Sequence, residues 1–552
     1  MYDVAILGAG LSGTALGSIL SKSGLKVIIL EDKCHPRFAV GESTIPQTSA
    51  MMRIIGLKYQ FPELIHISSY TSLVKISNTS GVKRNFGYVY HQKDKETTTD
   101  TCLQTVIPDL PHGPECHWFR QDIDHYMLQA AIKYGVEIRQ DTRLVDYRIE
   151  NDGVYLETGN GDTVKAQYLV DCSGHKSPVA EKEALRMKDP QLQTNTRTVF
   201  NHFIDVPPFD HILDSRPRFP RLWFQGTVHH IFKGGWFWVV PFNNTQVSKN
   251  QLCSVGICLD RDIYPLKGQD PVREFYDMAA QYPSVFRHFE KAKPTRSWVT
   301  TDRIQYNCHK TVGDRYCLMN HSVGFLDPMF ARGFVNTMET IDITAERIIS
   351  AVKKDDFSAS FFAPLDRFHK SAMTCNDELI SMAYKSFNDY RLWNAAFRVW
   401  FTGVTLGVVR LNRFLNKYHQ TKDPRYLDVF GPEVKYHGFI SPDYEDYYRL
   451  FTAAREIIIR AAAGETDTDK SCREVMQLLE GSGLCPDVFG IGKPDLKFPR
   501  AYGLRFFRRI AGWGKKRAPE YVRQNYFDYN ASTFIKTVIK NRGMKKALEV
   551  RV

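Results

Sequence analysis

The first thirty residues constrain the fold most strongly, because they combine a short apolar strand, a glycine-rich turn and a helix. Residues 2–7 read as a strand, Gly8-Ala9-Gly10-Leu11-Ser12-Gly13 opens a helix to about Ser23, and residues 26–30 form a second strand before Glu31. In such a βαβ unit Gly8 permits the tight turn, Gly10 lets the backbone approach a pyrophosphate, and Gly13 lets the helix pack on the sheet. The helix N-terminus offers N–H donors to phosphates, and Glu31 is placed for ribose hydroxyls. We therefore expect a dinucleotide site here.

The length of the chain, 552 residues, predicts more than one domain, since single cores usually stop growing near ~250–300 residues. The nucleotide domain is expected to be discontinuous, over residues 1–65, 107–194 and 306–350. Short apolar runs such as 235–242 and 253–259 predict an antiparallel β-rich domain over 66–106 and 195–305. Residues 351–552 read as mostly helical. The expected fold class is therefore α/β, with a Rossmann-type domain, an antiparallel β substrate domain and a helical C-terminal region.

The net charge of +12 is concentrated late in the chain, for example at Lys515, Lys516 and Arg517. No nucleic-acid module accompanies these charges, so we do not expect a nucleic-acid partner. The charges indicate either a solvated surface or long-range attraction of an acidic partner, such as a carrier protein loaded with substrate. The C-terminal region has no evident place in nucleotide chemistry at this stage.

The cysteines and the hydropathy pattern favour a cytoplasmic protein. The 11 cysteines contain no CxxC pair, so neither a disulfide framework nor a metal site is expected. The N-terminus leaves no room for a signal peptide before the first strand. The apolar stretch from Trp400 to Val409 is shorter than the ~20 residues of a membrane span and is expected to be a buried helix, not a transmembrane segment.

Two further segments identify the expected nucleotide as FAD. Residues 168–174, Tyr-Leu-Val-Asp-Cys-Ser-Gly, resemble the VDASG segment of FAD enzymes of the hydroxybenzoate-hydroxylase type. Arg120 with Asp124 and Leu128 resembles the RxxxDxxL helix start of the same enzymes. The resemblance implies that Arg120, Asp171 and Gly174 belong to the FAD site.

Three more segments narrow the expected class of FAD enzyme. Residues 40–46 (VGESTIP), 235–241 (GWFWVVP) and 324–333 (GFLDPMFARG) resemble the signatures of flavin-dependent halogenases. The resemblance covers residues 1 to about 350 and is nearer to the members that act on phenols, pyrroles or aliphatic carbons than to those that act on free tryptophan. It implies an oxidoreductase of secondary metabolism that uses reduced FAD, oxygen and chloride or bromide to make hypohalous acid.

The same resemblance implies further site residues. It places Glu42, Ser43, Thr44, Asn320, Asp327 and Pro328 at the flavin, and Arg332 and Gly333 at the halide. Two departures matter: Met319-Asn320 stands where such flavoproteins usually have Gly-Asp, and Phe330 stands at the position of the glutamate of tryptophan-type members. The second departure argues against tryptophan as substrate.

A lysine and two tryptophans complete the expected site. Lys83 is the first choice for the lysine that receives the oxidised halogen, because Tyr88-Val89-Tyr90 follows it as in the family. Lys75 is the alternative, since its distance from the 41–44 loop fits slightly better. Trp236 and Trp238 are expected to line a tunnel, on the interpretation that they face opposite sides of a strand and that one sheet face cannot bury both.

Two other functions remain open at this stage. The first is a FAD-dependent monooxygenase or reductase on the same scaffold, which would not depend on halide. The second is a non-catalytic flavin-binding protein, favoured by the Met319-Asn320 change. A single dinucleotide fingerprint is visible, so a separate flavin reductase is expected to supply reduced FAD to an enzyme whose substrate is a free or carrier-bound small molecule.

Overall fold

The N-terminal βαβ unit lies at the centre of an eight-stranded sheet. The structure is a computed structural model that describes residues 1–109, 111–213, 219–431, 434–498 and 503–530. Strands β1 (Tyr2–Leu7) and β2 (Val27–Leu30) pair in parallel, and α1 (Leu11–Lys22) connects them. β1 also pairs in parallel with β10 (Thr163–Asp171), so the turn that opens α1 stands at the carboxyl edge of the central strands. The predicted strand, turn and helix are confirmed.

The rest of this sheet comes from segments far apart in the sequence. The order is β17-β18-β10-β1-β2-β7, and β8 and β9 extend it next to β10. These strands are β7 (Glu137–Arg139), β8 (Leu144–Glu150), β9 (Gly153–Thr158), β17 (Val312–Gly313) and β18 (Tyr316–Leu318). Helices α5 (Arg120–Lys133) and α10 (Gly333–Lys354) pack against α1. Short helices α6 (Pro178–Lys182) and α9 (Asn320–Val323) lie in the loops beyond β10 and β18.

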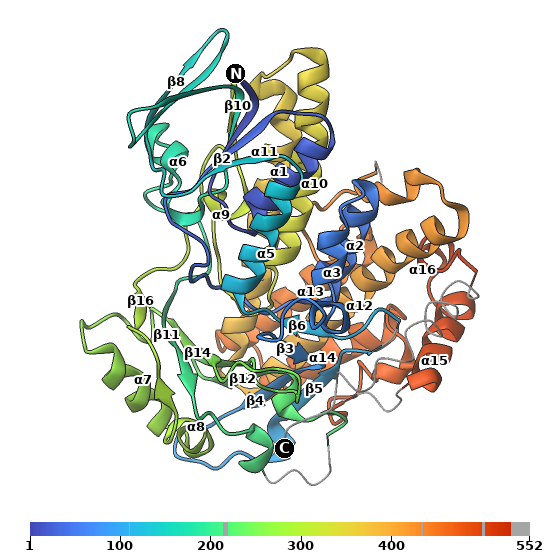
Figure 1. Ribbon diagram of the computed structural model, residues 1–552. Coiled ribbons are helices and arrows are strands. Elements are labelled where there is room, and N and C mark those ends of the chain that lie inside the picture. The colour runs from blue at the N-terminus through green and yellow to red at the C-terminus, as the bar shows by residue number, and fades with distance from the viewer. Residues whose placement is uncertain (110, 214–218, 432–433, 499–502, 531–552) are drawn as a thin grey trace.

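A second eight-stranded sheet lies below the first in the view of Figure 1. Its order is β15-β11-β14-β13-β12-β4-β5, with β16 beside β11, and α7 (Pro271–Ala280) and α8 (Pro283–Phe289) flank it. The strands are β4 (Asn85–Tyr90), β5 (Cys102–Val106), β11 (Thr196–Ile204), β12 (Thr227–Phe232), β13 (Gly235–Pro241), β14 (Cys253–Asp260), β15 (Lys293–Pro294) and β16 (Val299–Thr301). The expected antiparallel arrangement needs one correction, because β12 and β4 pair in parallel. A parallel pair requires a long connection, which the segment between these two strands provides.

A two-stranded sheet made by β3 (Gly81–Lys83) and β6 (Glu115–His117) is connected to the loop after β2. An isolated bridge joins Ser43 of that loop to His117. The loop then continues into α2 (Pro46–Lys58), α3 (Pro62–Ile67) and α4 (Tyr70–Leu73). The small sheet therefore holds residues 41–44 next to Lys83, at the end of β3.

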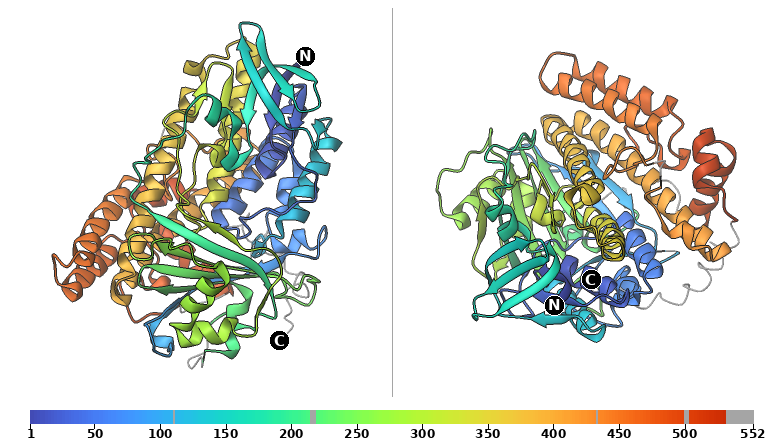
Figure 2. Two further views of the ribbon diagram at one scale, coloured as in Figure 1. Left: turned by 90° about the vertical axis from the view of Figure 1, so that its left-hand side faces the viewer. Right: turned by 90° about the horizontal axis from the view of Figure 1, so that it is seen from above.

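The C-terminal region is helical, as predicted. It contains α11 (Ala359–Ser386), α12 (Tyr390–Thr421), α13 (Glu445–Ala462), α14 (Thr468–Gly481), α15 (Gly503–Lys516) and α16 (Glu520–Tyr526). Figure 2 shows the orange and red helices along one side of the molecule, next to the yellow α10 and α11. The expected buried helix over residues 400–409 is part of α12. By length and composition α12 alone among the described helices is apolar enough to cross a membrane, but 78% of its apolar window is buried.

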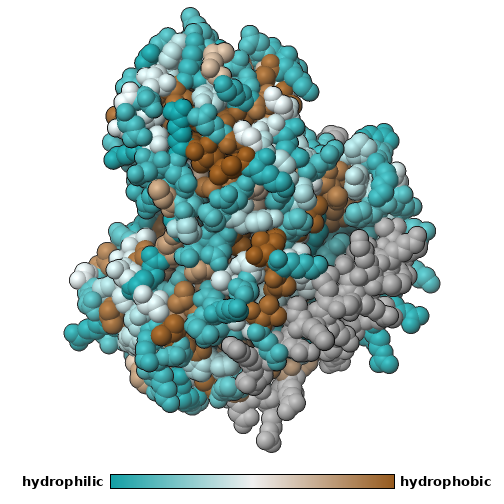
Figure 3. All heavy atoms as spheres, in the orientation of Figure 1, coloured by the Kyte–Doolittle hydropathy of each residue, from teal (hydrophilic) through white to brown (hydrophobic). Residues whose placement is uncertain are grey.

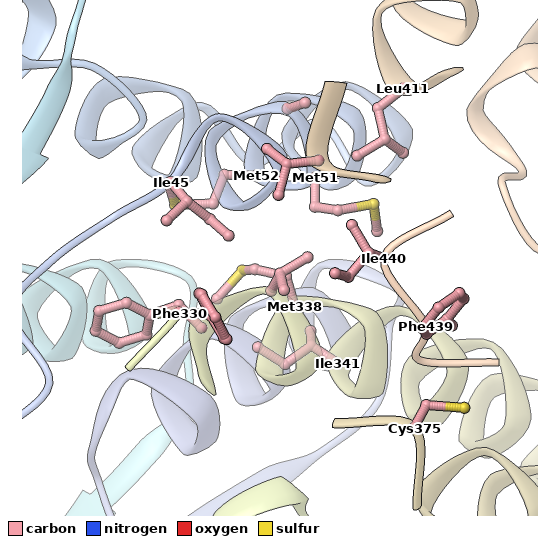
Figure 4. Close-up of a cluster of buried hydrophobic side chains, with 14 of the residues drawn as sticks. Ile45, Met51, Met52, Phe330, Met338, Ile341, Cys375, Leu411, Phe439 and Ile440 are labelled. Atoms are coloured by element: carbon pink, nitrogen blue, oxygen red, sulfur yellow. The ribbon is translucent and has the colours of Figure 1, made fainter. Parts of the chain in front are cut away.

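The C-terminal helices share a core with the nucleotide-binding part. Figure 4 shows Met51 and Met52 of α2 near Met338 and Ile341 of α10, with Leu411 of α12 and the Phe439-Ile440 segment completing the cluster. Burying such side chains together stabilises the contact by roughly 1.5–3 kcal/mol for each fully buried residue. The C-terminal region is therefore an integral layer of the fold. On the face shown in Figure 3, apolar residues form small patches between hydrophilic ones.

Candidate functional site

A cavity of about 590 Å³ runs from the N-terminus of α1 to the second sheet. Its lining joins three parts of the chain: the βαβ turn, the second sheet and the C-terminal helix α11. Of the residues predicted for the site, those that line it are Gly10, Glu42, Ser43, Lys83, Arg120, Gly174, Trp236, Trp238, Asn320, Asp327, Pro328, Arg332 and Gly333. A volume of this size suits a large organic ligand.

The glycine turn leaves room for a ligand at one position only. Gly8 has a φ of +94°, and a Cβ there would lie 2.9 Å from the Cys172 carbonyl oxygen. A Cβ on Gly13 would lie 2.0 Å from the Gly8 carbonyl oxygen. A Cβ on Gly10 would meet only the Arg37 guanidinium, at 3.7 Å. Gly8 and Gly13 are therefore required by the chain itself, whereas Gly10 keeps space open at the helix N-terminus.

This end of the cavity fits the pyrophosphate of a dinucleotide. The Ser12 Oγ lines the cavity, is buried and has no hydrogen-bond partner within the part of the chain that the structure describes. Arg120 also lines the cavity, donates to the Val40 and Gly41 carbonyl oxygens at 2.5 and 3.0 Å, and pairs with Asp124. An orphaned hydroxyl beside unpaired helix N–H groups and a cation is a donor set for phosphate oxygens.

Three predicted residues lie behind the cavity lining. Glu31 accepts the Ala9 N–H at 2.7 Å and an Arg37 N–H at 3.1 Å, and burial raises its pKa. Asp171 is fully buried and accepts from Ser173, Ser177, Val179 and Ser322. Thr44 donates to Glu115 at 2.7 Å. In the structure these side chains hold the turn and the loops that the ligand would contact.

The loop over the cavity is held by a helix of the C-terminal region. Asp327 Oδ1 accepts the Met329 N–H at 3.0 Å, while its Oδ2 accepts from the Thr196 hydroxyl at 3.0 Å and the Tyr384 hydroxyl at 2.9 Å. Burial raises the pKa of Asp327 to about 6. The Tyr384 hydroxyl in turn accepts from Trp236 Nε1 at 3.0 Å.

The C-terminal region, whose role was not evident from the sequence, therefore contributes to the cavity. Tyr384 belongs to α11 and lies behind the lining, and five residues of that helix line the cavity: His369, Ala372, Met373, Asn376 and Ile380. Sequence reasoning missed them because no local motif marks them. The sequence around these residues shows only the amphipathic pattern of a helix, and every helix packed on a core has that pattern.

The start of α10 forms another part of the lining. Arg332 is the N-cap residue and makes no side-chain capping bond. Its guanidinium donates to Asn376 at 3.1 Å, Gln47 at 2.8 Å and the Gly438 carbonyl at 2.9 Å. Asn320 lies 3.4 Å from the Gly333 carbonyl oxygen, so the amide that replaces the usual carboxylate still faces this helix start. Helix N-termini attract anions, and here a buried cation adds to that field.

The prediction that Trp236 and Trp238 face opposite sides of their strand is wrong. Successive side chains alternate, so residues i and i+2 share a face. In β13 the two indoles lie side by side with ring centroids 5.9 Å apart, and both line the cavity. Their Nε1 atoms donate to different partners, Tyr384 at 3.0 Å and Ser254 at 3.2 Å, which fixes each ring.

The structure places the two candidate lysines very differently. Lys83 is 1% exposed and lines the cavity, whereas Lys75 is exposed on the segment after α4 and is not part of the lining. Lys83 Nζ donates to Ser43 Oγ at 2.6 Å and to the Thr44 carbonyl at 3.1 Å, and it stands 3.8 Å from the centre of the Phe86 ring. Burial lowers the pKa of Lys83 to about 7, against the opposing effect of Glu115.

Sequence reasoning missed the buried partners of Lys83. Glu115 is its register partner across the β3–β6 pair, and its carboxylate also accepts from Ser49 at 2.6 Å. Burial raises the pKa of Glu115. His117, two residues later, donates from Nδ1 to the Pro241 carbonyl oxygen at 2.9 Å, and its Nε2 lies 2.9 Å from Thr227 Oγ1. The Glu-Cys-His of β6 is a weak signal, because the sequence alone does not show that this short strand is buried.

Comparison with known proteins gives consistent matches. The FAD binding domain family matches residues 1–254. Monodechloroaminopyrrolnitrin halogenase PrnC of Pseudomonas fluorescens is 41% identical over 536 residues, 96% of this chain and 94% of the relative. Tetracycline 7-halogenase of Kitasatospora aureofaciens is 38% identical, over 93% of this chain and 92% of the relative. The crystal structure of halogenase PltM with phloroglucinol and FAD superposes with a TM-score of 0.86 at 32% identity, covering 90% of this chain and 99% of that one.

Proposed function

Because the chain belongs to the flavin-dependent halogenases, we propose that it uses reduced FAD, oxygen and a halide to halogenate an electron-rich aromatic ring, such as a phenol or a pyrrole. One observation carries this proposal. The lining of one cavity includes Gly10 of the dinucleotide turn, the buried Lys83, Trp236 and Trp238. A monooxygenase on the same scaffold would have no use for a buried lysine in this lining.

The residues present fit FAD. Gly10, Ser12 and the N–H groups that open α1 would hold the pyrophosphate, and Arg120 would add a positive charge beside it. Gly174, Asn320 and Pro328 also line the cavity and would contact the rest of the FAD. Bound FAD, once reduced, supplies the oxygen chemistry that oxidises the halide to hypohalous acid.

The halide would bind at the start of α10. Gly333 opens this helix of 22 residues, and the N–H groups of its first turn point out of the helix end. The Arg332 guanidinium is buried nearby, where its three hydrogen bonds hold it in place. Helix dipole and cation act together on a small anion, with more effect in a water-poor cavity than on a surface.

The indoles and the lysine would handle the oxidised halogen. Trp236 and Trp238 form one side of the passage and keep the substrate from direct contact with the flavin. Lys83, with a pKa lowered to about 7, exists near neutral pH as both ammonium and amine. The ammonium can hydrogen-bond hypohalous acid, and the amine can accept its halogen. Both forms direct the electrophile at a substrate held in the same cavity.

The substrate is proposed to be a free small molecule. The two relatives that match almost the whole chain, including the helical C-terminal region, are named for halogenation of monodechloroaminopyrrolnitrin and of tetracycline, and PltM was crystallised with phloroglucinol. All three are small aromatic molecules or contain a phenolic or pyrrolic ring. A carrier-bound substrate is the alternative, and it would need the basic surface of α15. We further propose a separate flavin reductase as the source of reduced FAD, and a cytoplasmic location.

The test is halogenation of a panel of phenols and pyrroles by purified protein with reduced FAD, oxygen and bromide or chloride. We expect monohalogenated products by mass spectrometry, and none when halide is omitted. Lys83→Ala should abolish the product while reduced FAD is still oxidised, and Lys75→Ala is the matched control that should keep wild-type yield. Oxygenated products that do not depend on halide would contradict the proposal and favour a monooxygenase.

A further inference from the structure

An imidazole stands in the sheet wall of the cavity, close to Lys83. His229 of β12 is 4% exposed and lines the cavity. It shares its sheet face with Thr227, which precedes it by two residues and is therefore roughly 6.5 Å away along the strand. The Thr227 hydroxyl lies 3.2 Å from Ser43 Oγ, which accepts from Lys83 Nζ at 2.6 Å. His229 and Lys83 therefore belong to one part of the cavity wall.

Aromatic rings flank this imidazole on two sides. Strand β12 lies between β4 and β13 in the second sheet. Tyr88 of β4 stacks on His229 with ring centroids 4.5 Å apart and an angle of 22°, and Trp236 of β13 lies 5.4 Å away at 31°. One edge of the imidazole is also occupied, because Nδ1 lies 2.9 Å from the Gly87 carbonyl oxygen. The edge that carries Nε2 is therefore the part of the ring left for the cavity.

The bond to Gly87 fixes which nitrogen of His229 carries the proton. A carbonyl oxygen can only accept, so Nδ1 is the donor. Burial lowers the pKa of His229 to about 3, although the bond to Gly87 opposes this shift, and the charge of Lys83 lowers the pKa further. The ring is therefore neutral near pH 7, and Nε2 keeps a free lone pair. No donor within the described part of the chain reaches Nε2.

The other polar side chains on this face of the second sheet already have partners within the protein. They are Thr198, Thr227, Trp236, Trp238 and Ser254. A buried acceptor without a donor is unfavourable, and a ligand that supplies the donor removes this cost. The wall beside Lys83 is therefore complementary to a ligand that brings an O–H or N–H group to His229.

We infer that His229 recognises the substrate by accepting its O–H or N–H hydrogen at Nε2, so that the enzyme selects electron-rich rings that carry such a donor, as phenols and pyrroles do. This inference rests on the proposed function, in which Lys83 directs the halogen in the same cavity. Because the acceptor and the lysine share one wall, the bond to His229 would hold the ring beside Lys83. A ring that carries only ether oxygens or an N-methyl group brings no donor.

The same bond would favour the halogenation step itself. While the halogen adds to the ring, positive charge spreads over the ring and onto its hydroxyl oxygen or ring nitrogen, and the attached hydrogen becomes a stronger donor. The bond to a neutral acceptor is then stronger in the transition state than in the bound substrate, which raises kcat and not only the affinity. His229 makes a hydrogen bond and takes up no proton, so its neutral form is the one that acts.

The test compares two substrates that differ by one methyl group, 3-methoxyphenol and 1,3-dimethoxybenzene, with bromide as the halide. Both rings are electron-rich, but only the first has an O–H. The ratio of their kcat/KM values, divided by the ratio of their rates with free hypobromous acid at the same pH, measures recognition by the protein. An acceptor left without a partner by the ether gives an expected corrected ratio of roughly 10–100 for the wild type. A corrected ratio near one would overturn the inference.

Two variants at His229 separate the acceptor from the packing of the wall. His229→Phe keeps an aromatic ring between Tyr88 and Trp236 but has no acceptor, whereas His229→Gln offers an amide oxygen. We expect the corrected ratio to fall to about one in the first variant and to remain well above one in the second. An unchanged ratio in His229→Phe, even with slower turnover of both substrates, would overturn the inference, because the residue would then act on hypohalous acid or on packing.

Tyr88→Phe is the matched control, since it changes the ring stacked on His229 without removing the acceptor. We expect this variant to keep the wild-type ratio. A ratio lost equally in Tyr88→Phe and His229→Phe would assign the effect to packing and refute recognition by His229. Thermal unfolding and FAD affinity of each variant show that the protein is intact.

A measurement without turnover gives an independent check. In wild-type protein labelled with ¹⁵N-histidine, the resonances lost in His229→Gln identify His229, and we expect the proton on Nδ1. The resonance of the unprotonated nitrogen should move when 3-methoxyphenol is added and not when 1,3-dimethoxybenzene is added. A proton on Nε2, or equal movement with both compounds, would contradict the inference. If the wild-type enzyme halogenates nothing in the panel, the proposed function fails, whereas halogenation with a corrected ratio near one fails the recognition by His229 alone.

Discussion

Tyr384→Phe tests how the C-terminal helix α11 holds the cavity. The substitution removes one oxygen atom, which accepts from Trp236 Nε1 at 3.0 Å and donates to Asp327 Oδ2 at 2.9 Å. All three side chains are buried. A hydrogen bond to a carboxylate contributes about 1.5–3 kcal/mol, and a buried N–H without a partner costs about 1–3 kcal/mol. We therefore expect the free energy of unfolding to fall by about 4 kcal/mol at pH 8.

The pH dependence gives this prediction its sharpest test. The pKa of Asp327 is raised on folding to about 6, so the folded protein binds this proton more tightly than the unfolded chain does. That contribution to stability is present at low pH and is lost as pH rises through about 6. Loss of the Tyr384 hydroxyl destabilises the ionised Asp327 more than the protonated Asp327. The difference in the free energy of unfolding between wild type and variant should therefore be smaller at pH 5 than at pH 8.

Tyr88→Phe is the matched control. Tyr88 is 1% exposed, and its hydroxyl has no hydrogen-bond partner among the described residues. Loss of an unpaired buried hydroxyl should leave stability unchanged or raise it. Urea unfolding of the protein without FAD, followed by tryptophan fluorescence at both pH values, measures the two variants. Equal losses in Tyr384→Phe and Tyr88→Phe, or a loss in Tyr384→Phe that does not change with pH, would refute the reasoning.

The remaining predictions concern the cofactor, the lysine and the surface. Gly10→Val should fold normally, because only Arg37 lies near its Cβ, yet lose FAD binding in a fluorescence titration; full occupancy would sink the assignment. Glu115→Gln removes the charge that raises the pKa of Lys83, so the halogenation profile should move to lower pH, and an unchanged profile would speak against Lys83 as the titrating group. Charge reversal at the end of α15, by Lys515→Glu, Lys516→Glu and Arg517→Glu, should leave the turnover of a free phenol unchanged at low and high salt. A turnover rate with carrier-bound pyrrole that falls as salt is added would instead favour docking of a carrier protein.

Local motifs predicted the parts of the site that consecutive residues build. The turn at residues 8–13 was predictable because Gly13 closely approaches the Gly8 carbonyl oxygen and Gly10 leaves the helix N-terminus open. Lys83 was preferred to Lys75 because of the aromatic residues that follow it, and Lys83 is the one that lines the cavity. The error at Trp236 and Trp238 concerned only the strand periodicity, and correct use of the alternation would have placed both indoles on one face.

Contacts between distant segments could not be predicted in the same way. Thr227 and His117 are 110 residues apart, and Tyr384 and Trp236 are 148 residues apart. The residues next to a threonine in a strand or a tyrosine in a helix do not indicate which distant side chain it will hydrogen-bond. Such pairs are fixed by the packing of β6 on the second sheet and of α11 on the cavity, which only the whole fold determines.

The reach of the Arg332 side chain to the Gly438 carbonyl oxygen has a consequence for synthesis of the protein. The glycine turn leaves the ribosome first, and residue 438 follows 425 residues after Gly13, roughly 20–85 s later at ordinary rates of translation. Until then the start of α10 and the helix α11 lack the segment that their Arg332 and Asn376 side chains bond to. A nascent chain can display the phosphate-binding turn before the segment that holds Arg332 has been made, so we expect the cavity to close around the cofactor late in synthesis.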